Sequence, residues 1–251
     1  MTEIALDRFV RPARSVSLRR LAARAHAGWA ELGAIVLLYL LYEACRGAVD
    51  GSLSTALAHS RQIVDLERWL GLFWEHRIQD ATAAVPGLDG LLGLAYVTLH
   101  LGATAGVLVW IHRRHHERFP LVRTALVVAT ALALTIYFAY PAAPPRLAGV
   151  GLADTVSTTT HVNLSSNLLG SFYNPIAAVP SLHFGYALLV GLAVAALARR
   201  PLVRVLGALY PAFVLLVIVA TGNHFLFDAF AGGLVTVAGY LVARRLVTVD
   251  S

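Results

Sequence analysis

The chain contains no lysine, because all twenty of its basic residues are arginine. This absence excludes a lysine nucleophile, a Schiff base and a lysine that binds phosphate. Cysteine is nearly absent as well, and a single thiol, Cys45, can form neither an internal disulfide nor the cysteine cluster of a zinc or iron–sulfur site. Charge is also scarce: 14% of the 251 residues are charged and 58% are hydrophobic, with a mean hydropathy of +0.69. A chain with so little polar surface is expected to fold in lipid rather than in water.

The sequence does contain long apolar runs. A helix needs about 20 mainly apolar residues to cross the hydrocarbon core of a membrane, and several runs reach this length. No internal repeat or low-complexity tract interrupts them, so we expect one membrane-embedded domain over residues 1–251. The predicted fold class is all-α, a polytopic bundle of six transmembrane helices. The predicted spans are roughly 29–47, 90–112, 121–140, 180–198, 202–220 and 223–243.

The arginines gather at the ends of these runs, which is typical of membrane topology and argues against a nucleic-acid partner despite the net charge of +6. If the N-terminus is cytoplasmic, 15 arginines fall on the inner side and five on the outer side. Basic residues are retained inside, so we expect an integral plasma-membrane protein with a basic cytoplasmic segment at 1–28 and both termini cytoplasmic. The segments 48–88 and 141–179 are then extracytoplasmic.

The first outer segment contains IVDLERWLGLFWEHRIQD, in which apolar residues repeat at helical spacing. It predicts an amphipathic helix at the membrane interface, which either packs over the bundle or shapes a lipid entrance. The second outer segment begins PAAPPRLAG, and its prolines are expected to end the third span and to stiffen the loop that carries Arg146.

Polar residues that can do chemistry concentrate at two outer helix mouths. NPIAAVPSLHFGYA carries Ser181 and His183 at the start of the fourth span, and ATGNHFLFDAFAGG carries His224 and Asp228 at the start of the sixth. On a helix, His224 and Asp228 would share one face, and the carboxylate could accept the Nδ1 proton, as a nucleophilic histidine requires. His183 could protonate a departing alkoxide. Ser181, at a helix N-terminus, and Arg146 could bind phosphate oxygens.

PSLHFGYA and NHFLFDAFAGG, with PPR upstream, resemble the three signature motifs of the type 2 phosphatidic acid phosphatase and vanadium haloperoxidase superfamily. PAAPPR and NPIAAVPSLH resemble the branch related to inositol phosphorylceramide synthase. The resemblance implies that His224 becomes a phosphohistidine, that Asp228 orients it and that His183 acts as acid and then as base. It implies phosphate binding by Arg146 and Ser181, and neither a metal nor another cofactor.

Two positions depart from the superfamily pattern, which usually has a lysine seven residues before the arginine of its first motif and an arginine six residues before the histidine of its third. Here these places hold Ala139 and Ile218. We expect replacement cations from the first outer segment, namely Arg61, Arg68 or Arg77.

Asn223 and His100 are assigned as accessory site residues. Asn223 directly precedes His224, and His100 lies near the middle of the second span with Tyr96 one turn before it. For His100, packing between helices is the stronger interpretation and lining of the same cavity is the alternative.

The predicted function is a membrane phosphatase that hydrolyses a lipid-linked phosphate with water as the acceptor. Transfer of an inositol-phosphate-like or other polar phospho head group to a polyol is the first alternative, because the same histidine can activate either acceptor. A membrane carrier that binds an anionic lipid without turnover is the alternative from another class. The oligomeric state does not follow from the sequence.

Overall fold

The structure is a computed structural model that describes residues 52–160 and 176–247. Contacts along the chain divide it into the units Met1–Leu41 and Tyr42–Ser251, and every described residue belongs to the second unit. The predicted first span, 29–47, and the basic segment before it lie outside the described residues.

Helices make up the regular structure of the described ranges, apart from an isolated bridge between Ala142 and Ala177. Four of the helices are long and apolar enough to cross a membrane. They match four of the predicted spans and confirm, for this part of the chain, a polytopic all-α membrane protein. The four are α4 (Leu88–Arg114), α5 (Phe119–Ala139), α9 (Pro201–Ala220) and α10 (Leu226–Leu246).

The fifth apolar helix, α8 (Leu182–Leu197), is shorter than the predicted span at 180–198. Its 16 residues cover about 24 Å at the usual rise per residue, less than the hydrocarbon thickness of about 30 Å. The Ser181 side chain caps its start, and Arg199 and Arg200 follow its end. The six-span count therefore stays a prediction.

The first outer segment forms two helices where one was predicted. α2 (Leu53–Trp69) ends in a turn in which Gly71 has a φ of 70°, a conformation that favours glycine, and α3 (Glu75–Ala83) follows. Trp69 at the end of α2 is 81% exposed. Whether the two helices lie at a membrane interface stays a prediction.

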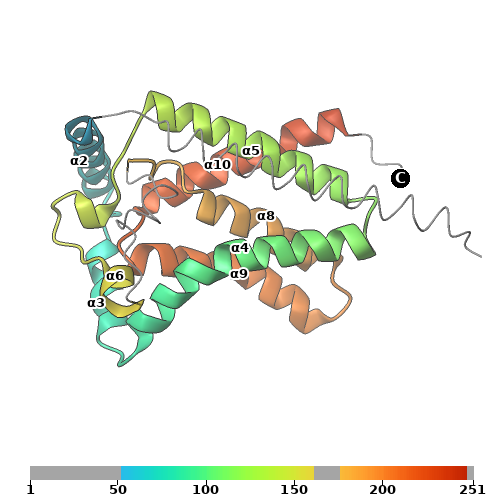
Figure 1. Cartoon of the computed structure of the whole chain (residues 1–251), viewed down its shortest axis with the longest axis horizontal. Coiled ribbons are helices and arrows are strands. Elements are labelled where there is room, and N and C mark those ends of the chain that lie inside the picture. Colours follow the sequence, from blue (N-terminus) through green and yellow to red (C-terminus); the bar gives the residue numbers. More distant parts are fainter. Residues whose placement is uncertain (1–51, 161–175, 248–251) are drawn as a thin grey trace, which may run out of the picture. The chain divides into compact units, whose positions relative to one another are not determined.

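The shorter helices α2, α3 and α6 (Thr155–Thr160) gather at one end of the long helices (Figure 1). α5 ends at Ala139, two residues before Pro141, as the prolines predicted. The 3-10 turn η1 (Pro145–Leu147) then joins this end of the bundle, because the Arg146 backbone N–H donates to the carbonyl of Gly222, between α9 and α10 (3.0 Å). The C-terminal ends of α5 and α9 and the N-terminal end of α10 therefore lie together.

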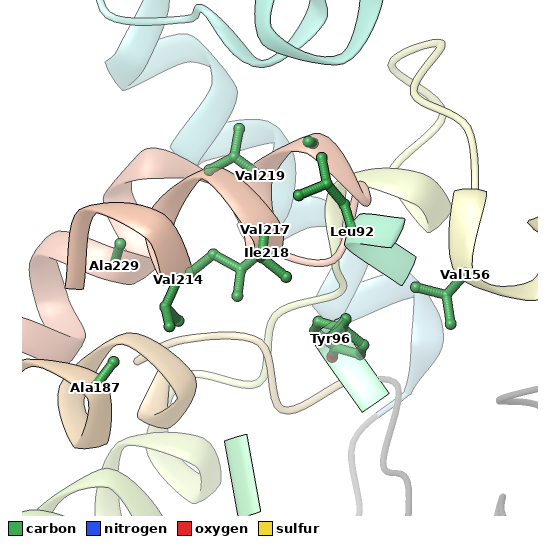
Figure 2. Packing of buried hydrophobic residues seen from close by; sticks show 10 residues of the cluster. Leu92, Tyr96, Val156, Ala187, Val214, Val217, Ile218, Val219 and Ala229 are labelled. Atoms are coloured by element: carbon green, nitrogen blue, oxygen red, sulfur yellow. The ribbon is translucent and has the colours of Figure 1, made fainter. Parts of the chain in front are cut away.

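Buried apolar side chains from α4, α6, α8, α9 and α10 pack against one another beneath this end (Figure 2). Tyr96, Val156, Ala187, Ile218 and Ala229 show how distant parts of the sequence meet in this cluster. Lipid provides no hydrophobic drive for helices to associate, so close van der Waals packing of this kind must hold the helices together.

Candidate active site

His224 and Asp228 form a buried pair at the start of α10. His224 Nδ1 lies 3.2 Å from Asp228 Oδ2, and the two side chains are 7% and 0% exposed. The contact is the one that their spacing predicts. His224 is not on the helix, however, because α10 begins at Leu226. His224 belongs to the preceding turn, in which its backbone N–H donates to the carbonyl of Ile218 (3.1 Å) and Gly222 has a φ of 69°.

His183 lies in the first turn of α8 and faces His224 across the site. The ring centroids of the two histidines are 5.5 Å apart. The His183 ring stacks on Tyr96 at 4.8 Å and also contacts His100 at 4.2 Å. His100 in turn stacks on Tyr186 at 5.4 Å. His100 thus lies beside His183, and whether it only packs between helices or also lines the site cavity stays a prediction.

Ser181 links α8 to α10. It is fully buried, its Oγ accepts from the Phe184 backbone N–H (3.4 Å), and its own backbone N–H donates to the carbonyl of Asp228 (2.8 Å). A Cβ added at Gly232 would come within 2.1 Å of the Ser181 carbonyl oxygen, so only glycine permits this approach of the two helices. The backbone N–H of Ser181 is therefore used inside the protein, and the hydroxyl group is the part of Ser181 that can donate to a substrate.

Arg146 is bound to the same turn that carries His224. Its side chain is only 2% exposed, its Nε donates to Asn223 Oδ1 (3.0 Å), and its Nη1 lies 3.6 Å from Asp154 Oδ2. Asn223 is held by its own Nδ2, which donates to the carbonyl of Thr221 (3.2 Å). The guanidinium is therefore oriented by two side chains, and the predicted accessory residue Asn223 is one of them.

The replacement cations predicted from the first outer segment are on exposed positions. Arg61 and Arg68 lie on α2 and Arg77 lies on α3, and the Arg68 guanidinium lies 5.0 Å from the centre of the Phe73 ring. Their participation in phosphate binding stays a prediction. Ile218, which stands where the superfamily pattern has an arginine, is buried in the apolar cluster of Figure 2.

Two buried glutamates at the site were missed by the sequence reasoning. Glu75 Oε1 accepts from the Leu226 backbone N–H (2.9 Å), and Glu67 Oε1 accepts from that of Phe227 (2.6 Å). Burial, together with the neighbouring Glu75 carboxylate, raises the pKa of Glu67 to about 9. The available signal was two acidic residues within LERWLGLFWE, but glutamates on an amphipathic helix normally face water.

Among the described residues, no group of three or more histidine, cysteine, aspartate or glutamate side chains is arranged to hold a metal ion. The prediction that the protein needs no metal or other cofactor is not tested by this observation.

A sequence model of the PAP2 superfamily matches residues 61–242, a range that includes every predicted site residue. The chain belongs to the PAP2 superfamily. Membership of the PAP2 superfamily indicates an enzyme of the phosphatase or phosphotransferase type that acts on lipid phosphates. The relation to the inositol phosphorylceramide synthase branch stays a prediction. No curated protein and no solved structure gave a significant match to the chain.

Proposed function

We propose that this protein is a lipid phosphatase of the PAP2 superfamily that works through a phosphohistidine on His224. The observation that carries the proposal is the meeting of three groups at one end of the bundle. His224 is hydrogen-bonded to the buried Asp228 carboxylate, and the His183 ring lies 5.5 Å from the His224 ring. These are the groups that a double displacement at phosphorus requires: a nucleophile, a group that orients it, and an acid/base.

In the first step, His224 Nε2 attacks the phosphorus atom of the lipid phosphate. Asp228 supports this attack, because it accepts a hydrogen bond from Nδ1–H, which leaves Nε2 as the basic nitrogen, and because it stabilises the positive charge that develops on the ring. The P–N bond forms while the P–O bond to the lipid breaks. A protonated His183 donates its proton to the departing alkoxide, so the products are a lipid alcohol and the phosphoenzyme.

In the second step, His183, now neutral, removes a proton from water as the water oxygen attacks phosphorus. The P–N bond breaks, inorganic phosphate leaves and His224 is restored. A polyol that took the place of water would give transfer instead, with the same proton movements. Hydrolysis is the reaction that we propose, and transfer is an outcome that the assay below distinguishes.

Arg146 and the Ser181 hydroxyl group bind the phosphate oxygens. The planar guanidinium matches the geometry of two phosphate oxygens, and its hydrogen bond to Asn223 and its ion pair with Asp154 orient it in advance. We also propose that this site faces the outside of the cell. The arginine-rich ends, such as the last turn of α10 with Arg244 and Arg245, lie at the opposite end of the long helices and would be cytoplasmic.

The test is release of inorganic phosphate by the purified protein in detergent. Phosphatidate, a prenyl diphosphate and a related lipid phosphate are supplied, each with and without inositol or glycerol. We expect release from at least one lipid, and a loss of roughly 10²-fold or more in His224→Ala and His183→Ala, since each removes a group that acts in both steps. Exposed His116, whose side chain is 84% accessible, gives the control His116→Ala, which should match the wild type.

Trapping of the intermediate makes the test specific for His224. Brief reaction with a lipid labelled in its phosphate should leave label on the wild-type protein that acid removes and alkali does not, as for a phosphohistidine, and no label on His224→Ala. Undiminished turnover by His224→Ala would overturn the mechanism. Phospho-polyol formed at the expense of free phosphate would identify a transferase. Retained lipid binding without turnover across the whole panel would instead favour a carrier.

A further inference from the structure

The first turn of α10 has an unusual set of partners for its backbone N–H groups. The first N–H groups of a helix have no partner within the helix. Here Phe225 donates to Asp228 of the same turn (2.9 Å), Leu226 donates to Glu75 of α3 and Phe227 donates to Glu67 of α2. Three carboxyl groups thus serve three successive N–H groups, and two of the three come from residues about 150 positions earlier in the chain.

Glu67 and Glu75, which we call the carboxyl pair, are buried with 2% and 0% exposure. In each, Oε1 accepts from the backbone of α10, whereas Glu67 Oε2 and Glu75 Oε2 have no hydrogen-bond partner among the described residues. The two carboxyl groups are nevertheless neighbours, because their Oε1 atoms accept from two successive N–H groups of α10, and the Glu75 carboxylate contributes to the raised pKa of Glu67. A proton on one of the two Oε2 atoms would therefore satisfy both.

The charges around the carboxyl pair favour the binding of one proton by the pair. The groups that act on Glu67 from the elements packed against it are Glu75 of α3 and Asp228 of α10, and both are acidic. Arg68, next to Glu67 on α2, is exposed and lies over the Phe73 ring. Three ionised carboxylates in one buried place would repel one another far more than the partial positive charge of one helix N-terminus can offset.

We propose that Glu67 and Glu75 share one proton and together act as positioning residues, which hold the first turn of α10 so that His224 and Asp228 stay aligned for phosphoryl transfer. In this arrangement Glu67 Oε2–H donates to Glu75 Oε2, and the pair carries a single negative charge. The pair binds α10 to α2 and α3 at the turn where Asp228 meets His224. The catalytic consequence rests on the proposed function, whereas the shared proton does not.

Glutamine substitutions test the shared proton, because glutamine resembles a protonated glutamate. In Glu67→Gln, the amide oxygen still accepts from Phe227 and the amide N–H₂ donates to the Glu75 carboxylate. In Glu75→Gln, the roles are exchanged. In the double variant, both amide oxygens are occupied by the backbone and two N–H₂ groups face each other without an acceptor. The double variant should therefore fail where each single variant succeeds.

The experiment compares kcat and the thermal unfolding midpoint of seven purified proteins in detergent: the wild type, Glu67→Ala, Glu75→Ala, the two glutamine variants, the double glutamine variant, and Asp65→Asn/Asp80→Asn. The last is the matched control, because Asp65 of α2 and Asp80 of α3 are exposed carboxylates on the same two helices. We expect each alanine variant to lose roughly tenfold or more in kcat and to unfold earlier, and each glutamine to restore most of both.

The double glutamine variant should lose roughly tenfold or more in kcat beyond the product of the two single effects, with a matching non-additive fall in the unfolding midpoint. Additive effects, or glutamine variants as impaired as the alanine variants, would overturn the shared proton. Unfolding is measured without a substrate, so a protein that fails to release phosphate still tests the pair. Non-additive unfolding with additive kcat effects would leave the pair with a structural role only and refute its positioning role.

A pH profile gives a readout that a merely structural role would not move. Ionisation of Glu67 above its pKa of about 9 would place two adjacent negative charges at α10, so wild-type kcat should fall as the pH rises through this value. Glu67→Gln has no proton to lose there and should not show this fall. Titration of His183 or His224 would affect both proteins alike, and an identical alkaline limb in the two proteins would count against the proposal.

Discussion

Asp228 Oδ2 serves two groups at once, since it lies against both His224 Nδ1 (3.2 Å) and the Phe225 backbone N–H (2.9 Å). One carboxylate oxygen therefore couples the orientation of the histidine ring to the first turn of α10. The Asp228 side chain is completely buried, so water cannot supply the hydrogen bonds that a substitution at this position would remove.

Asp228→Asn tests the charge of this carboxylate. The amide has the same shape, and its oxygen can take the place of Oδ2, but it carries no negative charge, so the variant weakens the hydrogen bond to Nδ1–H and no longer stabilises the positive charge that develops on the His224 ring. We expect kcat to fall roughly 10²- to 10⁴-fold, as for the loss of acid–base assistance, with the helix content by circular dichroism unchanged. A kcat within about twofold of the wild type would remove Asp228 from the mechanism.

Arg146→Lys tests the guanidinium of Arg146. Lysine keeps the charge but loses the fork of N–H groups and the Nε bond to Asn223. We expect kcat/KM to fall roughly 10- to 100-fold, the usual range for losing a hydrogen bond to a charged group. Arg113→Lys is the control, since Arg113 is exposed in the last turn of α4, and should leave kcat/KM unchanged. Equal values for the two variants would argue against phosphate binding by Arg146.

Among the elements, the contact between α8 and α10 matters most for the site, because α8 carries His183 and α10 carries Asp228. The two helices meet where Gly232 touches the backbone of Ser181. Gly233, the next residue, points differently, and a Cβ there would meet only side-chain atoms, those of Phe184 at 3.4 Å and of Leu188 at 3.9 Å. Neighbouring glycines therefore differ sharply in how much space they have.

The prediction at this contact compares Gly232→Ala with Gly233→Ala. An added Cβ at Gly232 would lie 2.1 Å from the Ser181 carbonyl oxygen, and rigid backbone must then move. We expect Gly232→Ala to lower the unfolding midpoint and to reduce kcat roughly tenfold or more, because a small displacement between catalytic groups is costly. Gly233→Ala should be close to the wild type in both measurements. Equal behaviour of the two variants would mean that this contact does not position His183.

The carboxyl pair predicts how stability depends on pH. Glu67 has an ordinary pKa near 4.5 when unfolded and about 9 when folded, so between these values the folded state holds a proton that the unfolded state has lost. The free energy of unfolding must then decrease as the pH rises through this window, by at most about 1.4 kcal/mol per pH unit. Unfolding midpoints measured from pH 5 to pH 9 should fall more steeply for the wild type than for Glu67→Gln. Parallel curves would contradict the raised pKa.

The orientation of the whole molecule in the membrane follows from the distribution of its arginines and can be measured directly. We predict that α3 is outside the cell and that the turn between α4 and α5 is inside. Single cysteines introduced as Ala83→Cys and His116→Cys, both at exposed positions, report on the two sides in a Cys45→Ser background. A membrane-impermeant maleimide added to intact cells should label the first and not the second, while both should react after the cells are broken. The reverse pattern would invert the topology.

The sequence alone determined those features of the protein that depend on the length of apolar runs and on the spacing of nearby residues. Four predicted spans appear as helices of membrane-crossing length, because about 20 apolar residues in lipid have few alternatives to a helix. The contact between His224 and Asp228 was also predicted from their spacing of four residues, and it forms between the turn that precedes α10 and the first turn of α10. The spacing did not reveal that His224 precedes the helix, because helix starts depend on capping partners elsewhere in the chain.

Tertiary structure alone decided the surroundings of these residues. His183 meets Tyr96 and His100 of α4, and Glu67 and Glu75 reach the start of α10, through contacts that join parts of the chain far apart in sequence. No periodicity records such contacts, because they depend on how the helices pack. A glutamate on an amphipathic helix has the same local sequence pattern whether its side chain faces water or a neighbouring helix. Only the packing of the helices determines whether the carboxyl group is buried, and burial in turn determines whether it keeps its proton.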